Sequence, residues 1–92
     1  MNWIAQQSYY KIQREVTGTE QTTIMDDRSM YLYKHKVMTQ YREFPIKDVL
    51  DMSFRKMGTE GGFLYLHTLQ GVYSYTVRTD PIEFIDHFKD LK

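Results

Sequence analysis

The chain has 92 residues with twelve basic and twelve acidic side chains and no cysteine. This length fits one domain that buries roughly 60–65% of its unfolded surface, and the lack of cysteine excludes disulfides, thiolate metal ligands and a cysteine nucleophile. The balanced charge argues against nucleic-acid binding, and no apolar run reaches the roughly 18–20 residues that span a bilayer.

The chain is expected to begin with a loose lead, residues 1–7, followed by one domain that covers residues 8–92. Because Met1–Ala5 lacks the basic and apolar regions of a signal peptide, we expect a cytoplasmic protein. In chain order the alternating and β-branched runs predict seven strands, at Ser8–Val16, Glu20–Met25, Met30–Lys34, Val37–Phe44, Leu50–Lys56, Phe63–Leu69 and Val72–Arg78.

Polar, glycine and proline residues separate these runs. Asp26–Ser29 is predicted as a turn, since Asp side chains bond their own downstream amides. His35 marks a tight reversal, and Pro45 ends the fourth run. Gln70-Gly71 is predicted as a two-residue hairpin turn, with glycine supplying the positive φ.

The C-terminal segment predicts a single amphipathic helix. Asp80 is suited to be the N-cap and Pro81 the first helical position, and Glu83 occupies the place of a capping-box partner. The helix carries an apolar stripe made of Ile82, Phe84, Ile85, Phe88 and Leu91. Because such a short helix is marginal alone in water, we expect it to pack against the strands.

Together these elements predict a mainly β fold, a partly open seven-stranded antiparallel barrel or sandwich capped by one C-terminal α-helix. The order of strands, the corner at Phe44-Pro45-Ile46 and the helix start at Asp80-Pro81-Ile82 resemble those of bacterial pleckstrin-homology-like (PH-like) domains. Residues 23–33 also resemble a strand–turn–strand unit of that family. The resemblance implies a binding or assembly module and supplies no catalytic residues.

Basic residues gather around the third predicted hairpin. Lys34, His35 and Lys36 form its turn, and Arg28 and Arg42 are near it in the sequence. A PH-like arrangement would place this turn at the open end of the barrel, on the same side as the first hairpin. A weak site for an anionic lipid or a phosphorylated ligand is one interpretation, and a solvated turn whose charges discourage edge pairing is the other.

Tyrosines indicate a surface for a protein partner. The tyrosines of neighbouring strands could form an outward aromatic face, or they could fill the core, because a register slip of one residue exchanges the two faces; they are Tyr31, Tyr33, Tyr65, Tyr73 and Tyr75. Tyr31 and Tyr33 are the candidate partner-binding residues. We therefore predict a small non-enzymatic binding or scaffold module that recognises a protein partner or forms a homo-oligomer, through an exposed strand edge or this face.

Catalytic signals are weak. The three histidines, His35, His67 and His87, show no metal-ligand spacing. Ser53, His67 and Asp51 permit a Ser–His–Asp arrangement, but no nucleophile elbow or phosphate-binding loop supports it. We expect no enzyme, no metal and no cofactor.

Overall fold

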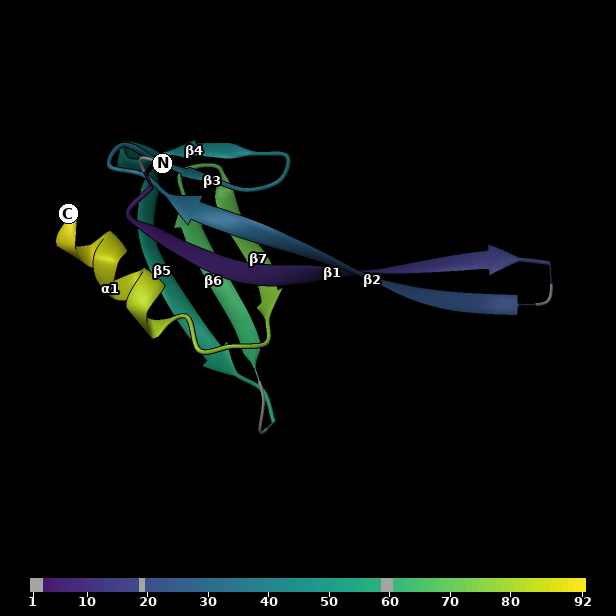
Figure 1. Ribbon diagram of the computed structural model, residues 1–92. Coiled ribbons are helices and arrows are strands. Elements are labelled where there is room, and N and C mark those ends of the chain that lie inside the picture. Colours follow the sequence, from purple (N-terminus) through teal and green to yellow (C-terminus); the bar gives the residue numbers. More distant parts are fainter. Residues whose placement is uncertain (1–2, 19, 59–60) are drawn as a thin grey trace.

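The computed structural model of the protein describes residues 3–18, 20–58 and 61–92, without the side chains of residues 13–17 and 20–23. The described elements are β1 (Ala5–Thr17), β2 (Glu20–Leu32), β3 (Lys36–Met38), β4 (Glu43–Pro45), the 3-10 helix η1 (Ile46–Asp48), β5 (Val49–Lys56), β6 (Gly62–Thr68), β7 (Gly71–Val77) and α1 (Ile82–Asp90). The strands form one antiparallel sheet in the order β4-β3-β2-β1-β7-β6-β5 (Figure 1).

This sheet curls without closing. β4 and β5 are its two edges, and β1 joins β7 through the pair Tyr10 and Thr76. α1 packs against β1 and β5, so it covers the inner face of the sheet, which would otherwise be exposed to solvent (Figure 1). The prediction of a mainly β, partly open antiparallel fold with one capping helix is confirmed.

The core lies between the inner face of the sheet and the helix. Its buried side chains include Met30, Leu32, Val37, Val49, Met52, Leu64, Leu66, Val77, Phe84 and Phe88. Fully burying one such side chain stabilises the fold by about 1.5–3 kcal/mol. Among the described residues, no helix has the length and apolar character needed to cross a membrane.

β1 and β2 form one long hairpin. Their register runs without a break from the pair Ala5 and Leu32 to the pair Thr17 and Glu20. The turn predicted at Asp26–Ser29 is therefore wrong, because each of these residues lies opposite a residue of β1. β1 also begins at Ala5, inside the segment expected to precede the domain, where Ala5 and Gln7 are buried.

The hairpin extends well beyond the rest of the sheet. Past Tyr10, no described residue of β1 pairs with β7, so Lys11–Thr17 and Glu20–Asp26 form a two-stranded ribbon that we call the arm (Figure 1). The molecule is accordingly elongated, with extents of 50 × 28 × 28 Å. At about 3.3 Å per residue, the arm reaches roughly 20 Å from the body of the molecule.

The predicted strand Val37–Phe44 is two short strands joined by a tight loop. The Thr39 amide donates to the Arg42 carbonyl at 2.8 Å, and the Arg42 amide donates to the Thr39 hydroxyl at 3.1 Å. These bonds close the loop between β3 and β4 and interrupt the ladder. The reversal predicted at His35 is present, since β3 begins at Lys36 and pairs back onto β2.

The hairpin between β6 and β7 turns one residue earlier than predicted. Thr68 pairs with Gly71, so Leu69 and Gln70 are the turn residues, and Gly71 begins β7 with a φ of 134°. The Thr68 hydroxyl closes the turn, because it donates to the Gly71 carbonyl at 2.8 Å and accepts from the Gln70 amide at 3.2 Å.

α1 begins as the sequence indicates, with a small shift. The Asp80 carboxylate accepts the Ile82 amide at 3.0 Å, and the Pro81 carbonyl accepts the first helical bond, from Ile85. Phe84, Ile85 and Phe88 are buried as predicted. Ile82 is 48% exposed, so its place in the apolar stripe is wrong; Pro81 is buried instead.

Candidate functional site

A polar groove lies where the arm leaves the body. It occupies about 260 Å³ and is lined by β1, β2, β7 and the loop between β3 and β4, through Tyr9, Lys11, Arg28, Thr39, Tyr41, Arg42 and Tyr75. Tyr9 pairs with Arg28, and Lys11 pairs with Asp26, so these four side chains share the inner face of the sheet. The groove is therefore the continuation of the core toward the arm, where the inner face turns from apolar to charged.

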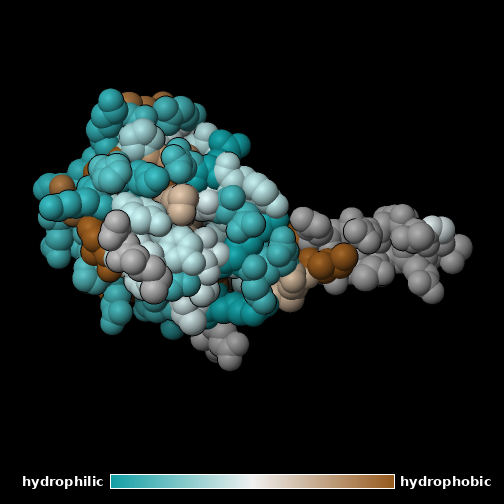
Figure 2. All heavy atoms as spheres, turned by 45° about the horizontal axis from the view of Figure 1, so that its top comes forward, coloured by the Kyte–Doolittle hydropathy of each residue, from teal (hydrophilic) through white to brown (hydrophobic). Residues whose placement is uncertain are grey.

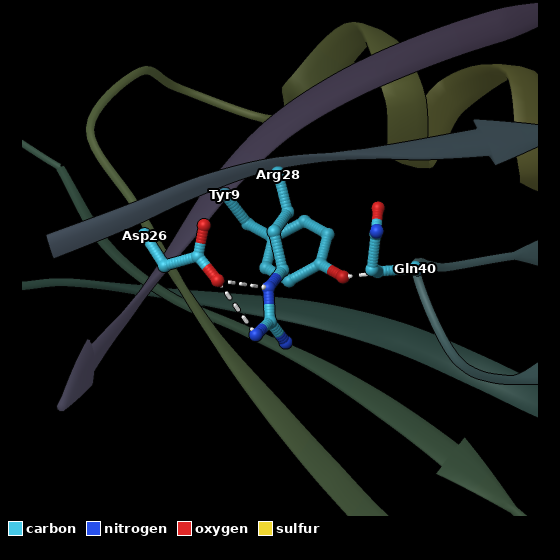
Figure 3. A network of polar contacts seen from close by, with 4 residues as sticks. All are labelled: Tyr9, Asp26, Arg28 and Gln40. Carbon is cyan, nitrogen blue, oxygen red and sulfur yellow. Dashed lines mark hydrogen bonds and ion pairs between the residues drawn. The ribbon is translucent and has the colours of Figure 1, made fainter.

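Arg28 is the most constrained cation of the groove (Figure 3). Its Nε and Nη2 donate to Oδ2 of Asp26 at 3.0 and 2.7 Å, and its guanidinium lies 4.9 Å from the centre of the Tyr41 ring. The side chain is only 11% exposed. The hydrogen bond to Asp26 raises the pKa of Arg28 above its usual value, so this cation is fixed in place and permanently charged.

Tyr9 and Tyr75 line the groove and fix the position of its neighbouring segments. The Tyr9 hydroxyl accepts the Gln40 amide at 3.2 Å, which holds the β3–β4 loop over the groove (Figure 3). The ring of Tyr9 meets the ring of Tyr75 edge to face at 5.0 Å. Burial raises the pKa of the Tyr75 phenol, against the opposing effect of a hydrogen bond with Thr39.

Two further cations flank Arg28. Lys11 Nζ lies 5.7 Å from the Tyr75 ring centre, and the Arg42 guanidinium lies 4.9 Å from the centre of the Tyr73 ring. Three cations thus line the groove, and each lies over an aromatic ring at a distance suited to cation–π contact, while Asp26 binds Arg28 alone among them in the described contacts. Such a groove can bind an anionic group, because charge-assisted hydrogen bonds to phosphate or carboxylate are the strong ones.

The structure separates the basic residues that the sequence grouped together. Arg28 and Arg42 both line the groove. Lys34, His35 and Lys36 lie at or beside the β2–β3 turn, at the opposite end of β3 from the loop that carries Arg42. There Lys36 forms an ion pair with Glu43 at 3.3 Å and lies 5.2 Å from the Tyr33 ring centre.

The expected position of that turn is wrong. β2 runs continuously from Glu20 to Leu32, so the β1–β2 turn and the β2–β3 turn lie at opposite ends of the same strand. A turn at Asp26–Ser29 would have reversed the chain once more and brought both turns to the same end.

The two tyrosines predicted to bind a partner are half-buried. Tyr31 lies 5.8 Å from Trp3 between ring centres, and the two rings are tilted. Tyr33 lies beneath Lys36 at the β2–β3 turn. Each ring therefore already packs against a neighbour of the same chain.

The Ser53–His67 pair considered in the sequence does form. Ser53 Oγ and His67 Nε2 lie 2.8 Å apart, and Asp51 is opposite His67 in the ladder. The Asp51 carboxylate, however, accepts the Met52 amide at 2.8 Å. In the described part of the chain, no group of three or more His, Asp or Glu side chains is arranged to hold a metal ion.

Tyr9, Lys11 and Tyr41 were not predicted as site residues, and Tyr75 was considered only for the aromatic face. These side chains come together because Lys11 pairs with Asp26 and because the β3–β4 loop folds over β2. Neither feature can be predicted from local sequence. Comparisons of the chain with protein-family models, with curated proteins and with solved structures found no match. The function is therefore inferred from the geometry of the chain itself.

Proposed function

We propose that the protein is a non-enzymatic cytosolic binding module that adds a strand to the outer edge of β2. The added strand is an extended segment of a protein partner or of a second copy of the chain. One observation carries the proposal: β2 pairs with β3 only at Tyr31 and Leu32, so from Glu20 to Met30 no described strand covers its outer edge. An open edge of this length is a template for strand pairing.

Hydrogen bonds at the end of β2 indicate which of its backbone amides point to the open edge and are available to an added strand. The Leu32 carbonyl accepts the Ile4 amide at 2.6 Å, toward β1, and the Tyr33 amide donates to the Lys36 carbonyl at 2.8 Å, toward β3. Backbone groups alternate in direction along a strand. The odd-numbered residues of β2 therefore direct their backbone groups to the open edge, and Thr23 is one of them.

A proline at Thr23 tests the proposal. Thr23→Pro removes one outward N–H and leaves the ladder between β1 and β2 intact, because proline is tolerated on an edge strand where its N–H would face solvent. Thr23→Ala is the matched control. Peptides selected from a phage-displayed random library should bind the wild type and Thr23→Ala, and lose most of their affinity for Thr23→Pro.

Light scattering after size exclusion tests the self-association branch of the same proposal. If neither library peptides nor a second copy binds the wild type, or if Thr23→Pro binds as well as Thr23→Ala, the strand-addition mode is wrong. Circular dichroism of both variants confirms that the fold is retained.

The groove favours a second candidate function, recognition of an anionic lipid or a phosphorylated ligand. The supporting observation is the convergence of Lys11, Arg28 and Arg42 on one groove. Sedimentation with acidic phosphatidylserine vesicles compares Arg28→Gln/Arg42→Gln with Lys34→Gln/Lys36→Gln. Loss of binding in the first variant alone would show that the groove binds the lipid, and loss in the second alone would show that the β2–β3 turn binds it. If the wild type does not bind the vesicles, an anionic lipid is not the ligand.

We also propose that the chain is a PH-like domain. The antiparallel strand order, the corner at Pro45 and the C-terminal helix over the open sheet support this assignment. An experimental structure whose strands join in another order would contradict it.

A further inference from the structure

We propose that the strand added to β2 is β2 of a second copy, so that two arms lie antiparallel about a twofold axis. This inference rests on the proposed function, that the outer edge of β2 accepts a strand, and it names the partner and the register. A twofold interface uses the same surface on both copies. An antiparallel edge meets that condition, because β2 can present its outward N–H and C=O groups to those of an identical strand.

The arm has properties that favour a second copy. A two-stranded hairpin is marginally stable at best in water without a hydrophobic face to cover. The arm nevertheless leaves Ile12, Ile24 and Met25 exposed, by 57%, 39% and 48%. Figure 2 shows apolar atoms at its base, where the arm meets the body. Pairing two arms would convert two narrow ribbons into one four-stranded sheet and would bring apolar side chains of the two copies together.

The direction of the backbone groups restricts the register. Only residues of equal parity can lie opposite one another, because the odd-numbered positions of both strands direct their hydrogen bonds across the interface. With Ile24 on the axis, Ile24 lies opposite Ile24 of the second copy, and Glu20 lies opposite Arg28. Opposite charges in directly opposed positions stabilise a sheet.

The neighbouring registers are less favourable. Moving the axis to Thr23 places Glu20 opposite Asp26, which repel each other. Moving it to Met25 places Ile24 opposite Asp26, an apolar residue against a carboxylate that already binds Arg28. The register centred on Ile24 also places position 20 of one β2 beside Arg28 of the other copy, a residue that lines the groove.

Cysteine cross-linking tests this register directly, because the chain has no cysteine. In the proposed dimer, Ile24 is a non-hydrogen-bonded pair with Cα atoms about 4.5 Å apart, a separation that a disulfide can bridge. Ile24→Cys should become a covalent dimer, with twice the 11.1 kDa of one chain, under mild oxidation. Met25→Cys is the matched control: Met25 is at least as exposed, but it would lie opposite Thr23.

The outcomes separate this inference from the proposed function. A wild type that stays monomeric at every concentration, with Ile24→Cys oxidising no faster than Met25→Cys, overturns the dimer. Strand addition itself still stands if library peptides bind the wild type and not Thr23→Pro. Glu20→Arg, placed in the Ile24→Cys background, should slow cross-linking because it opposes Arg28; an unchanged rate overturns the register.

Discussion

At the scale of single residues, Arg28 and Asp26 decide how the arm is joined to the body. Residues two apart in a strand lie on the same face, so an extended backbone lets the Arg28 guanidinium reach the Asp26 carboxylate, at 2.7 Å. The Asp26 carboxylate, which local sequence assigns to a turn, instead binds Arg28 on the surface of the strand. Because Arg28 also stacks on Tyr41, the pair holds the β3–β4 loop against β2 at the groove.

Because of Tyr75, the protein should become less stable as the pH rises into the alkaline range. Burial raises the pKa of its phenol in the folded state, so folding favours the protonated form. This contribution is fully present below the ordinary tyrosine pKa of about 10, and it is lost as the pH rises through the folded-state pKa. The free energy of unfolding, from urea titrations between pH 8 and 11, should therefore fall less steeply in Tyr75→Phe than in the wild type.

Tyr41→Phe is the control for that measurement, since the Tyr41 ring is exposed at the rim of the groove. It should retain the pH dependence of the wild type. Equal slopes for Tyr75→Phe and the wild type would show that the buried phenol is not the source.

At the scale of elements, α1 should contribute to stability through one face only. Phe88→Ala removes a ring from the buried side of the helix and should lower the free energy of unfolding by about 3–5 kcal/mol. Ile82→Ala, on the exposed side, should change it by no more than about 0.5 kcal/mol. Urea denaturation followed by circular dichroism measures both. Equal losses would mean that Ile82 packs against the domain in solution.

The helix and β2 show why some elements can be predicted and others cannot. The helix follows from signals within a dozen residues, among them the Asp80 carboxylate that accepts a first-turn amide. The continuity of β2 through Asp26–Ser29 depends instead on partners in β1, from Lys11 back to Ser8. Turn propensity describes the chain before those partners are in place, so tertiary pairing overrides it.

At the scale of the whole molecule, the absence of a turn at Asp26–Ser29 changes the location of the candidate site. Successive turns of an antiparallel sheet lie at alternate ends of its strands, so one turn fewer moves the next turn to the other end. Without a turn at Asp26–Ser29, Lys34 and His35 move to the end away from the arm, and Arg42 remains near it. The sequence could therefore identify Arg28 and Arg42 as candidates, but not the residues that meet them, because Lys11 and Tyr75 come from strands on the other side of the groove.

The arm should be separable from the body in stability. Every buried core side chain that the structure describes lies outside residues 12–25. Lys11 and Asp26 form a directly opposed pair, and the backbone of Asp26 faces β1, so the segment between them can be replaced by Asn-Gly as a two-residue hairpin turn. The shortened chain should fold with a free energy of unfolding within about 1 kcal/mol of the wild type, since shortening a closed loop changes its entropy only slowly.

The same shortened chain should lose strand addition, because most of the open edge of β2 is gone, while Arg28 and Arg42 remain in the groove. Binding of library peptides and self-association should disappear together, and the thermal unfolding transition should stay cooperative. A loss of several kcal/mol would instead show that the arm is part of the folding unit. Retained peptide binding would place the recognition surface on the body, where the edges of β4 and β5 are the remaining open strands.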